Sequence, residues 1–139
     1  MLLRQHATVS AFVAPSLNPG ERIQAILSFA EIGSSARRNL PFLASLGLVS
    51  AKSEPRACAV VVTDRRLVIV GQSRFPTLQP QSLSGDYPRA AVRVGAFSRN
   101  LFGGSLRLEI ADHEALGLTV RRAWRAQAQQ VAQMLGWHA

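Results

Sequence analysis

Two apolar runs separated by a charged turn decide the fold: residues 58–71 read CAVVVTDRRLVIVG. Neither run alternates apolar with polar residues, so we expect both strands of this hairpin to be covered on both faces. The turn lacks the Gly or Asn that a two-residue primed turn requires. We therefore expect the Asp64 carboxylate to accept hydrogen bonds from nearby backbone N–H groups. This structural interpretation is favoured over an anion site at Arg65 and Arg66.

The segments around this hairpin show the period-two alternation that is typical of half-buried strands. Four apolar residues of segment 21–33 are expected on one face: Ile23, Ala25, Leu27 and Phe29. The same alternation recurs before and after the turn at 112–114. Together these patterns predict strands at 22–32, 57–63, 66–72, 91–97, 105–111 and 115–121, with a short extra strand near 81–88.

The period changes near the end of the chain. Trp124, Ala128, Val131 and Leu135 lie at i, i+4, i+7 and i+11, which predicts one amphipathic helix over 122–135. Gly136 follows directly and suits a C-terminal cap.

The first residues are interpreted as a lead-in to the domain. Asn18-Pro19-Gly20 is a turn signal, so residues 1–20 are expected to hold one or two helical turns. Residues 21–136 then form one domain with a long first loop at 34–55.

The order of about seven strands followed by one helix resembles the bacterial pleckstrin-homology-like (PH-like) domains. Four stretches carry the resemblance: Leu17-x-x-Gly20-Glu21, the VVVTDRRLVIV hairpin, Asp86-Tyr87-Pro88-Arg89, and the terminal helix with Trp124. The resemblance implies a mainly β fold, in which a bent antiparallel sheet forms a barrel-like sandwich closed by the C-terminal helix. It also implies a binding or scaffolding module without catalysis.

Composition agrees with an anionic partner. The chain has 139 residues and 16 Lys and Arg against 8 Asp and Glu, a formal net charge of +8. Such a balance attracts nucleic acid, an anionic membrane or an acidic protein. No stretch is long and apolar enough for a membrane span, so we expect a cytoplasmic protein or one peripheral to the inner face of the membrane.

Catalytic and metal-binding patterns are not found in the sequence. His6, His113 and His138 are scattered, and Cys58 has no second Cys or nearby His. The sequence therefore predicts no enzyme, no metal and no cofactor.

The long loop 34–55 is the predicted binding site, because it combines basic flanks with an apolar middle. The candidate membrane-binding residues are Arg37, Arg38, Lys52, Phe42 and Leu43. In the alternative interpretation, residues 40–49 form a short helix that packs on the barrel or on a second copy, as in a homo-oligomer. The candidate interface residues are then Leu40, Leu46 and Leu48.

A second basic cluster opens the terminal helix, where Arg121, Arg122 and Arg125 form either an anion-attracting corner or a solvated face. The solvated face is the favoured interpretation. Taken together, the sequence predicts a noncatalytic module for an unidentified protein partner or anionic phospholipid, with a basic nucleic-acid-binding barrel as the alternative.

Overall fold

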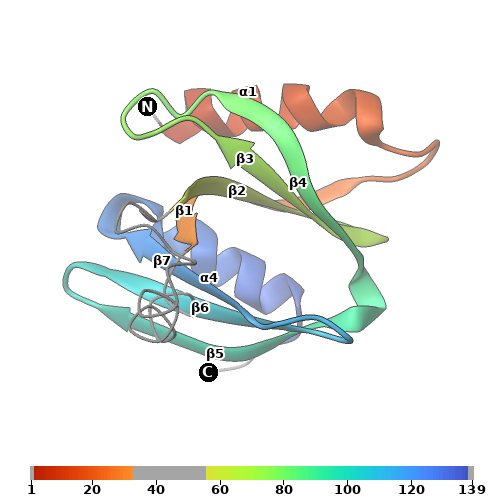
Figure 1. The fold of residues 1–139 in the computed structure, drawn as a ribbon. Coiled ribbons are helices and arrows are strands. Elements are labelled where there is room, and N and C mark those ends of the chain that lie inside the picture. The colour runs from red at the N-terminus through yellow and green to blue at the C-terminus, as the bar shows by residue number, and fades with distance from the viewer. Residues whose placement is uncertain (1, 33–55, 138–139) are drawn as a thin grey trace, which may run out of the picture.

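Seven antiparallel strands form one strongly bent sheet in the computed structural model, which describes residues 2–32 and 56–137 (Figure 1). The strand order is β4-β3-β2-β1-β7-β6-β5, so within the described residues the sheet stays open between β4 and β5. The strands are β1 Ile23–Ile32, β2 Arg56–Thr63, β3 Arg66–Gln72, β4 Pro80–Pro88, β5 Val92–Asn100, β6 Gly103–Ile110 and β7 Leu116–Arg121. The α-helices are α1 Leu2–Val13 and α4 Arg125–Met134, and a short 3-10 turn at Arg122–Trp124 leads into α4.

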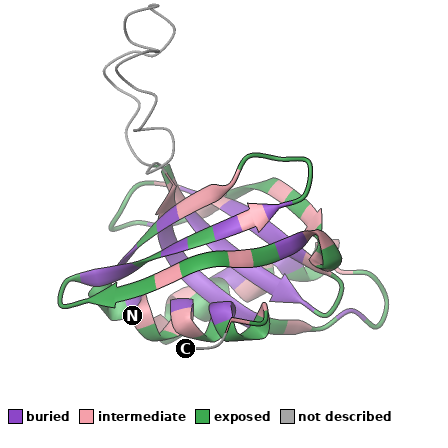
Figure 2. Cartoon of the chain, turned by 90° about the horizontal axis from the view of Figure 1, so that it is seen from below, coloured by how far each residue is buried: buried purple, intermediate pink, exposed green. Residues whose placement is uncertain are grey.

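The prediction of a mainly β fold, a bent antiparallel sheet of seven strands with one C-terminal helix, is confirmed. Buried residues concentrate on the inner strands, whereas turns and outer strand positions are exposed (Figure 2). The inner core contains the alternating residues of β6 and β7 that the sequence placed on one face, together with the α4 stripe of Trp124, Ala128 and Val131.

The central hairpin has a core on each face, as its apolar runs predicted. On β2, Val60 and Val62 enter the inner core between the sheet halves and α4. Their neighbours Ala59 and Val61 point the other way, into an outer core. Because both faces of these strands are buried, their sequences do not alternate apolar with polar residues.

The outer core exists because α1 covers it. Val9 and Val13 lie one helical turn apart on α1 and are fully buried against the hairpin. The helix has twelve residues, longer than the one or two turns expected from the sequence. Its stability comes from packing on β1, β2 and β3, so the pattern of its own residues understates its length.

One residue of β1 departs from the predicted face. Ala25, Leu27 and Phe29 point into the inner core, but Ile23 packs on the outer core. The pairing of β1 with β2 shifts register between Ile23 and Ala25. A bulge of this kind breaks strict alternation, because it reverses the side to which the following residues point.

The terminal helix is fixed at both ends. At its start, the buried Trp124 ring meets Phe29 edge-on at 5.0 Å and donates its Nε1–H to Gln5 Oε1 of α1 at 3.1 Å. At its end, Gly136 has φ +92°, and the N–H groups of Gly136 and Trp137 donate to carbonyls in the last turn at 3.0 Å. This is the Schellman cap that the sequence indicated.

Candidate functional site

The charged turn between β2 and β3 is structural, as predicted. Arg66 donates from Nε to Glu21 Oε2 at 2.9 Å and from Nη1 to Asp86 Oδ2 at 2.7 Å, and a third bond reaches the Ser16 carbonyl. Its guanidinium is thus committed to the chain's own oxygens. The alternative of an anion site that includes Arg66 is therefore not supported.

Glu21 lies at the centre of this network, with its side chain fully buried. Burial by itself raises the pKa of Glu21. Hydrogen bonds from Arg66, Thr63 and the Asn18 N–H, with the charge of Arg66, outweigh burial and lower that pKa to about 2. Glu21 is consequently a charged anchor for the turn.

The roles of two turn residues differ from the prediction in detail. The Asp64 carboxylate accepts a backbone N–H, but the donor is Arg22, on the chain entering β1, at 3.0 Å. The N–H groups inside the turn, those of Arg65 and Arg66, donate instead to Thr63 Oγ1 at 3.1 and 2.9 Å. A Thr hydroxyl caps such turns in the same manner as an Asp carboxylate.

All eight site residues that the sequence singled out in the long loop lie outside the described residues. They are Arg37, Arg38, Leu40, Phe42, Leu43, Leu46, Leu48 and Lys52. Their proposed membrane or interface roles stay predictions. The described ends of this segment, Ile32 and Arg56, are paired with each other across β1 and β2.

Among the described residues, the strongest candidate for a binding surface is the turn between β5 and β6. Leu101 and Phe102 occupy its tip with 67% and 84% of their surfaces exposed. The tip is ordered by the Asn100 side chain, whose Oδ1 accepts the Phe102 N–H at 2.9 Å. Two adjacent large apolar side chains in water have no structural benefit for an isolated monomer, so this tip is a candidate contact surface.

A basic hollow of about 330 Å³ adjoins this tip, and Arg99, Asn100 and Arg125 line it. Arg99 Nη1 donates to Gln129 Oε1 at 2.6 Å, and Arg125 Nη1 donates to the Asn100 carbonyl at 2.6 Å. These bonds join the β5–β6 turn to the start of α4. They also hold two positive charges beside the exposed apolar tip.

The other exposed apolar residues gather at the same end. Of six exposed large hydrophobic residues in the described chain, four lie at the start of α1, in the β3–β4 turn and in the β5–β6 turn: Leu3, Phe75, Leu101 and Phe102. Figure 1 shows these three elements and the start of α4 on one side of the molecule, at the left. We call this side the basic end.

Contacts between distant segments hold the basic end together. Phe75 stacks on Phe29 with ring centroids 5.7 Å apart and lies edge-on to Trp124 at 6.4 Å. The Arg121 guanidinium covers the Phe75 ring at 4.3 Å and forms an ion pair with Glu31 at 3.3 Å. The β3–β4 turn, β1 and β7 are therefore packed into one surface.

Charge is distributed unequally between the two ends. The elements of the basic end carry six arginines and, close to them, the carboxylate of Glu31: Arg4, Arg74, Arg99, Arg121, Arg122 and Arg125. The opposite end, formed by the β2–β3 and β6–β7 turns and the segments beside them, carries five carboxylates and four arginines. These are Glu21, Asp64, Asp86, Asp112 and Glu114, with Arg22, Arg65, Arg66 and Arg89. The described positive excess is thus concentrated where the apolar side chains are exposed.

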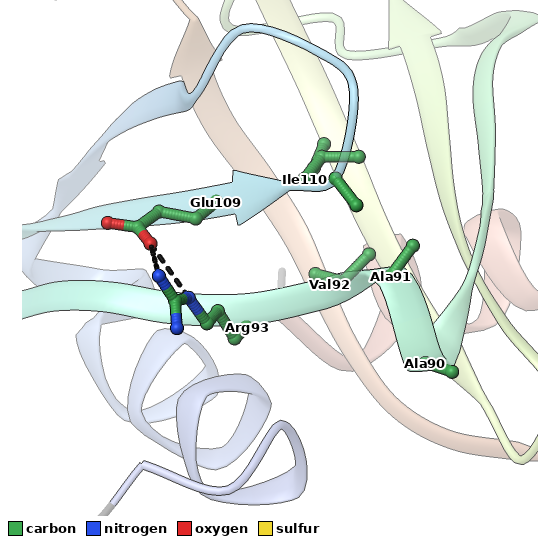
Figure 3. A pocket seen from close by; sticks show the side chains of 7 residues that line it. Ala90, Ala91, Val92, Arg93, Glu109 and Ile110 are labelled. Carbon is green, nitrogen blue, oxygen red and sulfur yellow. Dashed lines mark hydrogen bonds and ion pairs between the residues drawn. The ribbon is translucent and has the colours of Figure 1, made fainter.

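A second pocket, also of about 330 Å³, lies where β5 begins and β6 ends (Figure 3). Its walls are apolar, from Ala90, Ala91, Val92, Ile110 and Ala111. Its charged pair is already satisfied, because Arg93 donates to the Glu109 carboxylate at 2.8 Å. The lining residues include no nucleophile and no free general acid or base.

The remaining reactive groups in residues 2–32 and 56–137 are a buried thiol and dispersed titratable side chains. Burial raises the pKa of the Cys58 thiol to about 12, so the thiol stays protonated and unreactive. No three His, Cys, Asp or Glu side chains of these residues come together as metal ligands. None of the described helices has the length and apolar character needed to cross a bilayer.

The sequence analysis missed the apolar tip but found part of its basic surroundings. The segment Asn100-Leu101-Phe102-Gly103 joins two strands, and turns of this kind normally carry polar residues. The apolar pair Leu101-Phe102 at this turn was the sequence signal for an exposed apolar tip. Arg125, noted in the basic cluster that opens the terminal helix, lines the basic hollow, whose other side comes from β5.

Comparison with known proteins supports the fold. No family model matches the chain, and neither does any curated protein. A crystal structure of a pleckstrin homology domain from Shewanella amazonensis SB2B is similar over 91% of this chain and 94% of that chain. The TM-score is 0.50 and the sequence identity 16%. At this identity the likeness concerns the fold, which is PH-like.

Proposed function

We propose that this chain is a noncatalytic PH-like module that docks on an anionic membrane surface through its basic end. The observation that carries the proposal is the exposed pair Leu101 and Phe102 beside the arginine-lined hollow. A PH-like fold is compatible with a binding module, and the pattern of side chains argues for the membrane as ligand.

Two energy terms favour this ligand, and the basic end supplies both. Moving a Leu or Phe side chain fully out of water contributes about 1.5–3 kcal/mol. A basic residue close to an anionic surface contributes about 1 kcal/mol. Single terms of this size give weak, reversible contact, whereas two inserted side chains with several arginines give stable docking.

Liposome co-sedimentation of four double or single variants tests the proposal. Leu101→Ser with Phe102→Ser removes the apolar term, and Arg99→Glu with Arg125→Glu reverses the charge. Each change should weaken binding to anionic vesicles more than about tenfold. Matched controls are Leu83→Ser on exposed β4 and Arg65→Glu in the turn at the opposite end, and both should bind as the unchanged chain does.

The outcomes separate the candidate ligands. Equal losses in the tip variants and the controls would exclude the basic end as the docking surface. Failure of the unchanged chain to bind anionic vesicles at low salt, with retained binding to single-stranded oligonucleotides, would favour the nucleic-acid alternative. Failure with both ligands would leave a protein partner. Circular dichroism on each variant checks that the fold is intact.

A further inference from the structure

We infer that the basic end responds to the density of negative charge on a bilayer and does not select one lipid headgroup. The ligand class is then any bilayer rich in anionic phospholipid, such as phosphatidylserine or phosphatidylglycerol. This inference rests on the proposed membrane function and adds the kind of recognition.

The first reason is that the arginines of the hollow are partly committed within the chain. Arg99 and Arg125 each donate one Nη to the chain's own acceptors, Gln129 Oε1 and the Asn100 carbonyl, at 2.6 Å. A guanidinium that is bonded on one side still contributes its full charge. It has fewer N–H groups for the two-pronged contact with phosphate that gives geometric selectivity.

The second reason concerns backbone donors. Phosphate cages commonly use successive backbone N–H groups in a turn. At this tip, the Phe102 N–H already donates to Asn100 Oδ1 at 2.9 Å, which removes it from such a cage. Among the side chains, the Arg121 guanidinium also has partners within the chain, the Glu31 carboxylate and the Phe75 ring.

The third reason is exposure. Arg99, Arg122, Leu101 and Phe102 are exposed, and Arg125 is half-buried. A site discriminates strongly between ligands when a poorly matched ligand leaves buried polar groups unpaired. Exposed arginines stay hydrated whichever headgroup is present, so a mismatch costs little. The described part of the site thus has charge without a selective pocket.

Vesicles of matched surface potential provide the test. The unchanged chain is titrated with phosphatidylcholine vesicles that contain phosphatidylserine, phosphatidylglycerol or phosphatidylinositol 4,5-bisphosphate, with mole fractions adjusted to one zeta potential. We expect the dissociation constants to agree within about twofold and to rise steeply with salt in all three series. Soluble inositol trisphosphate should not compete.

Arginine-to-lysine substitution supplies an independent readout. Arg99→Lys and Arg125→Lys preserve charge but remove the planar fork, whereas Arg99→Gln and Arg125→Gln remove the charge. Charge-based recognition predicts near-normal binding for the lysine variants and a loss of about fivefold for each glutamine variant.

Three results would overturn the inference. The first is tenfold tighter binding to the phosphoinositide at matched potential, the second is competition by the soluble headgroup, and the third is an equal loss in the lysine and glutamine variants. Each of these leaves membrane docking in place. If none of the anionic vesicles binds, the proposed function fails and the inference with it.

Discussion

Replacing Glu21 by Gln should remove most of the acid sensitivity that the β2–β3 turn gives to this fold. Glu21 is the fully buried partner of Arg66, and its pKa is lowered from the usual 4.5 to about 2. Because its folded pKa is lowered, Glu21 contributes stability that is fully present above about pH 4.5. That contribution disappears as the pH falls through about 2.

The size of the effect follows from the same values. Each pKa unit corresponds to about 1.4 kcal/mol, so the difference between 4.5 and about 2 corresponds to about 3 kcal/mol. Near neutral pH, Glu21→Gln should lower the free energy of unfolding by about 3–5 kcal/mol, because Arg66 keeps the Ser16 carbonyl but loses its buried carboxylate partner and retains only the exposed one, Asp86.

Urea unfolding at a series of pH values, followed by tryptophan fluorescence, measures both quantities. The difference between the unchanged chain and Glu21→Gln should be largest above pH 4.5 and shrink toward pH 2. Glu114→Gln, the same chemical change at an exposed position of the β6–β7 turn, serves as control and should have little effect. A constant difference at all pH values, or a loss under about 1 kcal/mol near neutrality, would refute the assignment of Glu21 as a charged anchor.

The remaining predictions concern the basic end and α4. Trp124→Ala should lower the free energy of unfolding by about 3–5 kcal/mol in denaturant titrations, because the ring is buried against Phe29; a loss under about 1 kcal/mol would contradict that packing. Gly103→Ala should destabilise by about 3 kcal/mol or more, because its φ is +156° and an added Cβ would lie 2.0 Å from the Val120 carbonyl oxygen. Gly136→Ala, with φ +92° and nothing within 4 Å of the new atom, should cost only about 1–2 kcal/mol, and the reverse order of the two glycine variants would disprove this account.

The elements that the sequence predicted well are those with one buried face, whose apolar residues therefore recur at a regular period. The alternation in β6 and β7 and the α4 stripe each reflect burial against the inner core, so period alone located them. Gly136 was found because a left-handed cap favours glycine at one defined place. The length of α1 was underestimated, because Val9 and Val13 are buried by a core built from β1, β2 and β3, which no pattern inside residues 2–13 reveals.

The candidate site was less accessible to sequence reasoning for the same physical reason. The hollow forms where Asn100 at the end of β5 meets Arg125 on α4, and that proximity depends on the packing of α4 against β5 and β6, which no local pattern shows. A local reading assigned the arginines of 121–125 to a solvated helix face. The long-loop residues from Arg37 to Lys52 were accessible to sequence reasoning, and their membrane or interface role stays a prediction.

The covering of the hairpin by α1 has a consequence for the behaviour of this chain in concentrated solution. With α1 in place, the outer sides of Ala59, Val61, Val68 and Val70 are sealed from water. Strands this rich in valine and isoleucine, low in charge and free of proline are the kind that stack between molecules. By covering this apolar sheet face, α1 should reduce aggregation. Local unfolding of α1 would expose the apolar outer face of β2 and β3 while the inner core stays folded. The rate of aggregation during storage should therefore follow the local unfolding of α1 more closely than global unfolding.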